Sequence, residues 1–244
     1  DPMTVQVLSP QRMGPIGVQS LNLALQTVCN PGEGGVFVGA EGQVRTGDKV
    51  IHRKNNYTLD VMNGEIGWVL AADAKEGVGA ALLDAGWRPR VLLAVVDPER
   101  EERVAEVEEE AADADLRPVI SGTDPDKVVL FVDYGGNKRI GYTKEETRQV
   151  QLAYALTVHS GQGSQFPAVV FPIHKTHAYM LTRPLFYTAV TRAEKLVLLI
   201  GEQAAVAHAV RNTHGLERRT SLMERLRGAE AEQTKYERAV PEEV

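Results

Sequence analysis

Two short blocks near the end of the chain contain residues suited to binding phosphate. In the first block, Gly161 and Gly163 follow the apolar segment 152–158 in a polar turn, where backbone amides can approach an anion closely. In the second block, a short helical pattern with Thr182 as its expected N-cap ends at Arg192. An arginine held at a helix end suits a developing phosphate charge, because its planar fork stays charged and binds oxygens in pairs.

The segments around these blocks are typical of an α/β domain. Valine- and leucine-rich stretches at 5–9, 168–173 and 196–200 predict buried strands. The segment 18–28 predicts a helix whose leucines face the sheet, and 202–212 predicts a second helix. The phosphate-binding blocks would therefore be positioned by a sheet flanked by helices.

Several short strands interrupt this α/β pattern. They are expected at 36–38, 49–52, 65–71, 128–134 and 138–142. The last two predict a hairpin, because the intervening Gly135-Gly136-Asn137 is a turn sequence. Between the expected strands at 65–71 and 128–134, the segment 91–96 predicts a buried strand, and the acidic segment 98–114 resembles a helix with a solvated face.

A further group of functional candidates follows the expected strand at 49–52. Arg53, Lys54, Asn55, Asn56 and Tyr57 combine two cations, two amides and an aromatic ring. This mixture suits single-stranded nucleic acid: the cations and amides can contact the backbone, and the ring can stack on a base. The alternative is an exposed strand end with ordinary turn residues.

The two phosphate-binding blocks resemble the fifth and sixth conserved motifs of superfamily 1 helicases, in particular those of the RecD-like (exodeoxyribonuclease V alpha-chain) group. Thr157, His159, Gln162, Gly163 and Ser164 match Thr-x-His-x-x-Gln-Gly-Ser, and Tyr187, Thr188, Ala189, Thr191, Arg192 and Ala193 match Tyr-Thr-Ala-x-Thr-Arg-Ala. The run from Gly47 to Gly67 is also similar to that group. The strand, basic loop and helix at the start of the chain resemble its fourth motif, with Arg12 as the candidate phosphate contact; a plain loop arginine is the alternative.

The resemblance implies a RecA-like parallel sheet flanked by helices and interrupted by a small SH3-like β-barrel. We expect residues 1–60 and 143–215 to form the second RecA-like motor domain. Residues 61–142 would form the inserted barrel with its acidic helical elaboration, and 216–244 a charged C-terminal helix or tail.

The resemblance also implies site residues. The catalytic residue would be Arg192, acting as an arginine finger. The nucleotide-binding residues would be Arg12, Gly163, Ser164, Gln165 and Arg192. The DNA-binding residues would be Arg53, Lys54, Asn55, Asn56, Tyr57, Thr157, His159 and Gln162. At Gln165 the family usually has a glutamate.

The chain contains no Gly-x-x-x-x-Gly-Lys-(Ser/Thr) loop and no apolar strand that ends in paired acids. In the family that the chain resembles, both features belong to the first motor domain, so the resemblance implies that ATP and Mg²⁺ are held mainly by an N-terminal motor domain of the same polypeptide and that this chain alone does not hydrolyse ATP. Asp1-Pro2 ahead of Met3 is typical of a cloning scar, so we expect a fragment of a larger protein. His174 and His177 have no nearby cysteine or other histidine to complete a zinc set, so no metal site is expected.

The resemblance implies the C-terminal motor domain of an ATP-dependent 5′→3′ DNA helicase of repair and recombination, which supplies the arginine finger and part of a single-stranded DNA track. One alternative is the helicase portion of a conjugative relaxase. Another is a non-catalytic domain that binds DNA or protein.

The net charge of −6 is concentrated in one segment, since residues 97–115 contain ten acidic and two basic residues. The remainder of the chain does not argue against a nucleic-acid partner. The acidic insertion could instead contact other proteins. A single cysteine, with no signal-like or membrane-length apolar segment, leads us to expect a cytoplasmic protein without membrane contact.

Overall fold

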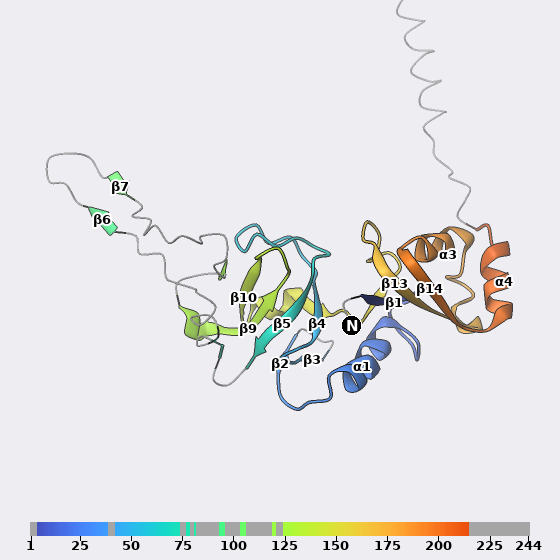
Figure 1. The fold of residues 1–244 in the computed structure, drawn as a ribbon, viewed down its shortest axis with the longest axis horizontal. Helices are drawn as coiled ribbons and strands as arrows, with labels where there is room; N and C mark the ends of the chain where they lie inside the picture. The colour runs from blue at the N-terminus through green and yellow to red at the C-terminus, as the bar shows by residue number, and fades with distance from the viewer. Residues whose placement is uncertain are drawn as a thin grey trace, which may run out of the picture.

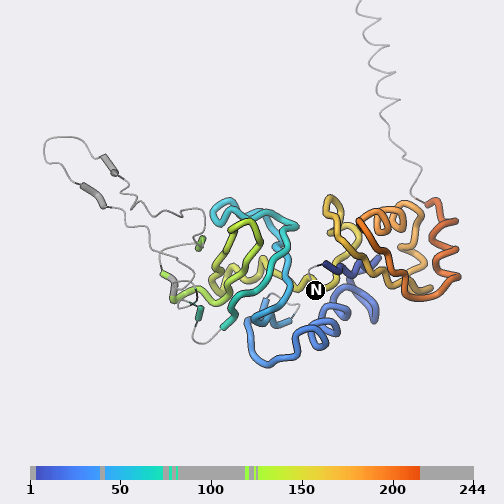
Figure 2. Tube along the Cα trace, viewed as in Figure 1, coloured from blue at the N-terminus to red at the C-terminus, as the bar shows by residue number. Residues whose placement is uncertain are grey.

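The structure is a computed structural model that describes residues 4–38, 42–73, 77–78, 81, 93–95, 103–105, 119–120 and 124–214. Two sheets lie side by side (Figure 1). The tube in Figure 2 shows how the chain connects them: it starts beside one sheet, passes through the other, and returns to the first for its last described elements. The predicted insertion of one unit into another is therefore confirmed in outline.

In the part of the chain that the structure describes, the first sheet has four parallel strands in the order β12-β1-β13-β14. Their bounds are Ala155–Thr157 for β12, Val5–Ser9 for β1, Phe166–Ile173 for β13 and Ala193–Gly201 for β14. At its centre, Val7 lies opposite Ala155 on one side and Val170 on the other. We call it the parallel sheet, and it confirms the predicted α/β class.

Among the described residues, three α-helices flank the parallel sheet: α1 (Val18–Cys29), α3 (Arg183–Val190) and α4 (Gln203–Arg211). A short 3-10 turn, η4 (Lys175–His177), precedes α3. Thr182 is the N-cap of α3, as predicted, because its hydroxyl accepts a hydrogen bond from the amide of Leu185. Apolar residues of α3 and α4 enter the same core as β1 and β13.

The fully buried residues of α1 are polar, and the prediction that its leucines face the sheet was wrong for Leu23, whereas Leu25 packs against the core of the second sheet. Asn22 and Gln26 are its buried residues, whereas Leu23 is 48% exposed. The amide of Asn22 donates to the carbonyls of Leu152 and Ala155 and accepts from the backbone N–H of Ala155 at 2.7 Å. The helix therefore covers a bend in the chain whose backbone groups need partners.

Strand β14 is exposed, so the prediction of a buried strand at 196–200 was also wrong. Leu196 is 58% exposed and Ile200 is 53% exposed. Within the described residues, β14 pairs with β13 on one side only, which makes it an edge strand. An apolar run alone does not distinguish a central strand from such an edge.

The second sheet contains the predicted hairpin and has the strand order β11-β4-β5-β9-β10-β8. The strands are β11 (Val150–Leu152), β4 (Lys49–His52), β5 (Ile66–Ala72), β9 (Val128–Asp133), β10 (Arg139–Thr143) and β8 (Val119–Ile120). All neighbours are antiparallel except β10 and β8. In the β9–β10 turn, Gly135, Gly136 and Asn137 all have positive φ, as a tight hairpin requires.

Shorter elements accompany the second sheet. They are the paired strands β2 (Val36–Phe37) and β3 (Gln43–Val44) and the 3-10 turns η2 (Pro125–Lys127) and η3 (Glu146–Gln149). Because β4 pairs with both β5 and β11, the second sheet begins at Lys49 and ends at Leu152. It therefore takes in residues that the sequence analysis assigned to the motor domain, whose expected limits were 60 and 143.

The acidic segment contains a strand where a helix was expected. Strand β7 (Arg103–Ala105) pairs antiparallel with β6 (Leu93–Val95), and Val104 lies opposite Ala94. The β-branched Val104 fits a strand better than a helix. The rest of the acidic segment and the tail at 216–244 lie outside the described residues. In the part of the chain that is described, no helix is long and apolar enough to cross a membrane.

Candidate nucleic-acid and nucleotide interface

The loop at 158–165 begins where β12 ends, and Thr157 shapes its first turn. The Thr157 hydroxyl accepts from the amide of Ser160 at 3.1 Å and donates to the Ser160 hydroxyl at 2.8 Å. The amide of Gly161 donates to the Thr157 carbonyl at 3.0 Å. Further along, Gly163 has φ of +87°, and no atom lies within 4 Å of the position a Cβ would take. The loop is therefore fixed at its start and open to a ligand at Gly163.

A groove of about 460 Å³ lies between this loop and the second sheet. It is lined by Arg53, Asn63, Gly64, Glu65, His159, Ser160, Gln162 and Ser164. Arg53 crosses from the second sheet to the loop, because its Nη1 donates to the Ser160 hydroxyl at 3.1 Å. The structure thus brings together three of the predicted DNA-binding residues, Arg53, His159 and Gln162, with Thr157 directly behind Ser160.

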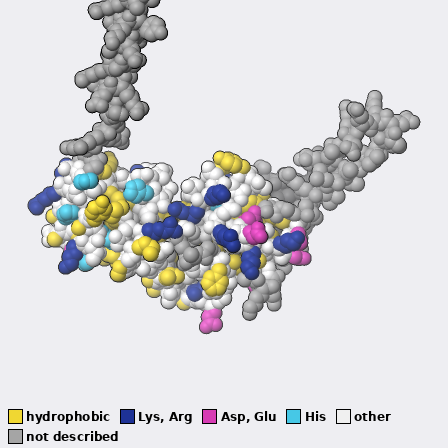
Figure 3. Space-filling model, turned by 180° about the vertical axis from the view of Figure 1, so that it is seen from behind, with side chains coloured by type: hydrophobic (Ala, Val, Ile, Leu, Met, Phe, Trp, Pro, Cys, Tyr) yellow, Lys and Arg dark blue, Asp and Glu magenta, His cyan; other side chains and the backbone are white. Residues whose placement is uncertain are grey.

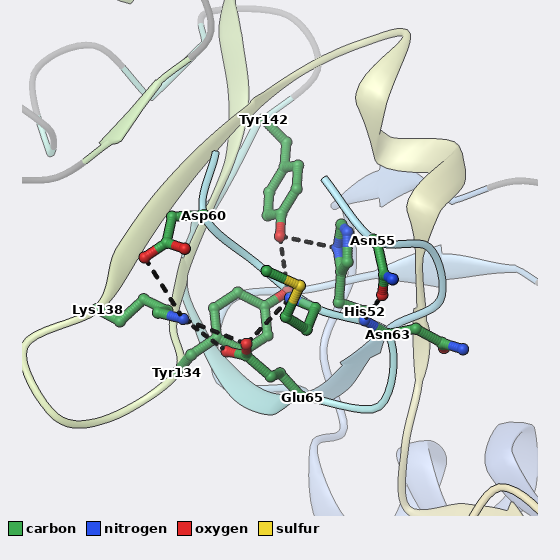
Figure 4. A network of polar contacts seen from close by, with 9 residues as sticks. His52, Asn55, Asp60, Asn63, Glu65, Tyr134, Lys138 and Tyr142 are labelled. Atoms are coloured by element: carbon green, nitrogen blue, oxygen red, sulfur yellow. Dashed lines mark hydrogen bonds and ion pairs between the residues drawn. The ribbon is translucent and has the colours of Figure 1, made fainter. Parts of the chain in front are cut away.

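The charge around the groove is mixed at close range. Figure 3 shows one face of the molecule as a whole, on which Lys and Arg side chains gather across the middle. Inside the groove, Glu65 adds a negative charge, but Lys138 neutralises it at 3.2 Å and also lies 4.0 Å from Asp60 (Figure 4). A negatively charged backbone therefore meets little uncompensated repulsion there.

A polar network supports the wall of the groove formed by Asn63–Glu65. His52 donates its backbone N–H to the Glu65 carbonyl and accepts from the Gly64 amide, both at 2.8 Å. Its ring nitrogen Nδ1 lies 3.0 Å from the hydroxyl of Tyr142, which lies 2.8 Å from that of Tyr134 (Figure 4). Burial lowers the pKa of His52 and raises the pKa values of Tyr142 and Tyr134, so all three rings stay neutral near pH 7.

The remaining members of the 53–57 group lie beside the groove and do not line it. Asn55 accepts a hydrogen bond from the amide of Asn63 at 2.9 Å. Asn56 accepts from two backbone amides and donates to Gln149 at 3.2 Å. These amides shape the loop. Lys54 is exposed, and the ring of Tyr57 is 78% exposed, so it is accessible for stacking.

Arg192 lies at the end of α3 and contacts the 158–165 loop. Its Nη1 donates to the Ser164 carbonyl at 3.1 Å, and its Nε donates to the Thr188 carbonyl at 3.3 Å. The backbone carbonyl of Arg192 accepts from the amide of Phe166 at 2.8 Å. Ser164, which also lines the groove, is therefore in direct contact with the candidate arginine finger, and the neighbouring Gln165 side chain is exposed.

Arg12 lies exposed in the loop that follows β1, as predicted. The carbonyls of Gln11 and Arg12 accept hydrogen bonds from the amides of Val18 and Gln19 in the first turn of α1, at 3.1 and 3.2 Å. The Ser9 hydroxyl donates to the Ile16 carbonyl at 2.9 Å and closes the loop. These contacts fix the backbone that carries Arg12.

Sequence reasoning missed three groups in the groove. Ser160 was passed over because it falls on a variable position of the first motif, although its hydroxyl joins Arg53 to Thr157. Asn63 and Glu65 belong to the Met62–Gly67 run that resembles the family, but nothing in their types or spacing indicated that they face the loop at 158–165.

Two family profiles match the chain. Residues 152–200 match the UvrD-like helicase C-terminal domain, and residues 21–81 match the ATP-dependent RecD-like DNA helicase SH3 domain. With the parallel sheet and the two blocks described above, these matches show a helicase C-terminal domain together with a RecD-like SH3 domain. Within the helicases, the chain is therefore similar to the RecD-like group.

Named relatives agree with this assignment. The ATP-dependent RecD2 DNA helicase of Deinococcus radiodurans is 35% identical over 226 residues, which cover 93% of this chain and 24% of that protein. The RecBCD enzyme subunit RecD of Mycolicibacterium smegmatis is 41% identical over 80 residues, 33% of this chain and 14% of that protein. This chain thus spans about a quarter of the RecD2 relative.

Solved structures of Pif1 helicases are among those that match the chain. The Pif1 helicase from Bacteroides in complex with ADP-AlF3 and ssDNA gives a TM-score of 0.40 at 12% identity, covering 93% of this chain and 46% of that one. The Pif1 helicase from Candida albicans gives 0.41 at 16% identity, covering 88% and 48%.

Proposed function

We propose that the chain is the C-terminal motor domain of an ATP-dependent 5′→3′ DNA helicase. It acts with an N-terminal motor domain of the same polypeptide, binds single-stranded DNA in the groove, and presents Arg192 to the nucleotide. The observation that carries the proposal is that the groove and the candidate finger meet on one loop: Arg53 contacts Ser160, and Arg192 contacts Ser164.

The residues of this chain fit one side of a nucleotide site. Arg192 offers a guanidinium fork, and Gly163 leaves its backbone accessible to a phosphate. Arg12 adds a second cation on a fixed loop. No group of three or more potential metal ligands exists among the described residues, so Mg²⁺ would be held by the other motor domain. This division agrees with the lack of a Walker-type loop in the sequence.

The arginine of the proposed finger would stabilise charge that develops on the transferred phosphoryl group. In the conformation described, its fork is turned onto the Ser164 carbonyl and the Thr191 hydroxyl. Reaching a nucleotide would require the side chain to exchange these contacts for phosphate oxygens. The exchange adds charge-assisted hydrogen bonds at the transition state.

Replacing Arg192 in the complete polypeptide tests the proposal. Arg192→Ala should lower single-turnover ATP hydrolysis by roughly 10³–10⁵, because arginine fingers elsewhere contribute that much. Arg192→Lys should restore little, since a point charge does not reproduce the fork. Affinity for single-stranded DNA and the melting temperature are measured alongside.

Arg183→Ala is the matched control, because Arg183 starts the same helix and donates to the Val210 carbonyl. It should leave hydrolysis within about twofold of the parent. Hydrolysis by Arg192→Ala within a fewfold of the parent would make Arg192 a structural helix-end charge and favour the non-catalytic binding domain. ATP hydrolysis by the isolated chain, abolished by the same substitution, would contradict the expected division between two motor domains.

A further inference from the structure

Strand β4 is shared between the two hydrophobic cores of the molecule. All four of its residues are buried. Val50 belongs to the core of the second sheet, with Leu130 and Ile140, whereas Ile51 belongs to the core of the parallel sheet. Because side chains alternate along a strand, Lys49 lies on the same side as Ile51. The two sheets are therefore joined by the buried side chains of β4 as well as by the chain connections.

Lys49 inserts its ammonium group into the parallel sheet. The side chain is 1% exposed, and its Nζ donates to the carbonyl of Val5, the first residue of β1, at 3.2 Å. The same nitrogen lies 6.0 Å from the ring centroid of Phe166, the first residue of β13. Burial lowers the pKa of Lys49 to about 8, so the group is mainly charged at neutral pH.

Phe166 connects Lys49 with Arg192. The amide of Phe166 donates to the Arg192 carbonyl at 2.8 Å, and Phe166 lies opposite Ala193 in the β13–β14 pair. Phe166 also follows Gln165 directly in the chain. The Lys49 ammonium thus contacts the residue that fixes the backbone of the candidate finger.

The opposite end of β4 leads into the groove. His52 holds the Gly64–Glu65 wall through two backbone hydrogen bonds, and Arg53 donates to Ser160. One four-residue strand therefore has groove contacts at its carboxyl end and the Phe166 contact at its amino end. A shift of the second sheet that accompanies a ligand in the groove would move both ends together, since β4 is buried on both faces.

We propose that Lys49 is a positioning residue that fixes the Phe166–Arg192 pair relative to the groove and so couples the second sheet to the finger. The part of this inference that concerns catalysis rests on the function proposed above. The part that concerns the hydrogen bond between Phe166 and Arg192 does not depend on that function and can be tested on this chain by itself. Lys49 does not touch the proposed nucleotide or DNA, and its effect passes through Phe166.

Lys49→Met is the informative change, because methionine fills a similar volume without the charge. The substitution removes the desolvation penalty of the buried charge but leaves the Val5 carbonyl without this donor, so the two effects on stability oppose each other. A purely structural lysine would change the melting temperature without a local change at Phe166, whereas a positioning lysine loosens the Phe166–Arg192 hydrogen bond. The two roles therefore give different results in one protein.

The first measurement is amide hydrogen exchange on this chain. In Lys49→Met, the Phe166 amide should exchange at least about fivefold faster, whereas amides in the β9–β10 pair should be unchanged. Unchanged exchange at Phe166 would overturn the proposal. Faster exchange throughout both sheets, with a lower melting temperature, would also overturn it, because it would show only general destabilisation. Lys49→Gln provides a second variant if Lys49→Met does not fold, and it should show the same local increase.

The second measurement uses the complete polypeptide and separates this inference from the proposed function. Lys49→Met should lower kcat for DNA-stimulated ATP hydrolysis by about fivefold or more, with the Kd for oligodeoxythymidine within about twofold. The matched control is Tyr154→Phe, which removes a different buried contact, the 2.9 Å hydrogen bond from the Tyr154 hydroxyl to Asp48. This control should lower the stability of the fold without lowering kcat. A kcat within twofold of the parent in Lys49→Met would overturn the coupling. Absence of hydrolysis in the parent would instead overturn the proposed function and leave the exchange result intact.

Discussion

Arg53 should contribute one phosphate contact in the groove, and the size of that contribution can be estimated. Arg53→Ala removes the only arginine among the residues that line the described groove. For single strands, each neutralised phosphate contributes about 0.7 to the slope of log K against log salt concentration. One lost contact therefore lowers the slope by about 0.7. If the variant and the parent bind equally at 1 M salt, the variant then binds about fivefold more weakly than the parent at 0.1 M salt.

The loop should remain folded in this variant. Ser160 loses its bond from Arg53 but keeps both bonds to Thr157. Fluorescence anisotropy with a labelled oligodeoxythymidine, at salt concentrations between about 0.05 and 0.4 M, gives both affinity and slope. Lys127→Ala is the matched control, because Lys127 is a basic residue outside the groove that pairs with Asp124 at 3.2 Å. The control should change neither quantity.

An unchanged slope in Arg53→Ala would refute the reasoning. Ser160→Ala separates a structural role of Arg53 from a phosphate contact, since it removes the hydrogen-bond partner of Arg53 and leaves the charge in place. Equal losses of affinity in the two variants at every salt concentration would mean that Arg53 only holds the loop. A loss of slope in Arg53→Ala alone would assign it to the phosphate backbone.

Three other predictions test the fold and the groove. Asp48→Ala should lower the free energy of unfolding by about 2–4 kcal/mol in urea titrations, because it strands the buried hydroxyl of Tyr154 and the amide of Arg45; a loss under about 1 kcal/mol would contradict this. Burial lowers the pKa of His177 in the folded chain, so as the pH falls the unfolded chain is protonated at this histidine before the folded chain is. Stability should be level above pH 7 and fall as pH decreases through about 6.5, and a His177→Leu variant should show a shallower fall. Tyr57→Ala should weaken DNA binding by about 1–3 kcal/mol if a base stacks on the exposed ring, with Tyr57→Phe as the control that keeps the ring.

The elements that carry the phosphate-binding blocks could be predicted from sequence because their local signals are strong. Thr182 followed by a proline in the first turn predicts the start of α3, and the structure gives Thr182 the cap hydrogen bond. The Gly135–Asn137 turn likewise predicts the β9–β10 hairpin. In each case the information lies within a few residues of the feature.

Features that depend on distant partners could not be predicted. Asn22 on α1 looks like a surface residue by type, but its buried amide serves backbone groups more than one hundred residues away in the chain. Leu196 looks like core, yet it is exposed because β14 has a neighbour on one side only within the described residues. Residue type alone does not give these contacts, since sheet order decides them.

The same reasoning applies to the amino end of the second sheet, which includes residues that the sequence analysis assigned to the motor domain. Lys49–His52 contains a lysine and a histidine, which are unusual in a fully buried strand. The two polar side chains have partners in different sheets: Lys49 at Val5 in the parallel sheet, and His52 at Tyr142 in the second sheet. A strand with this composition therefore suits a position where two cores meet. That position allows contacts in the groove and at Phe166 to move together, which a strand within a single core could not provide.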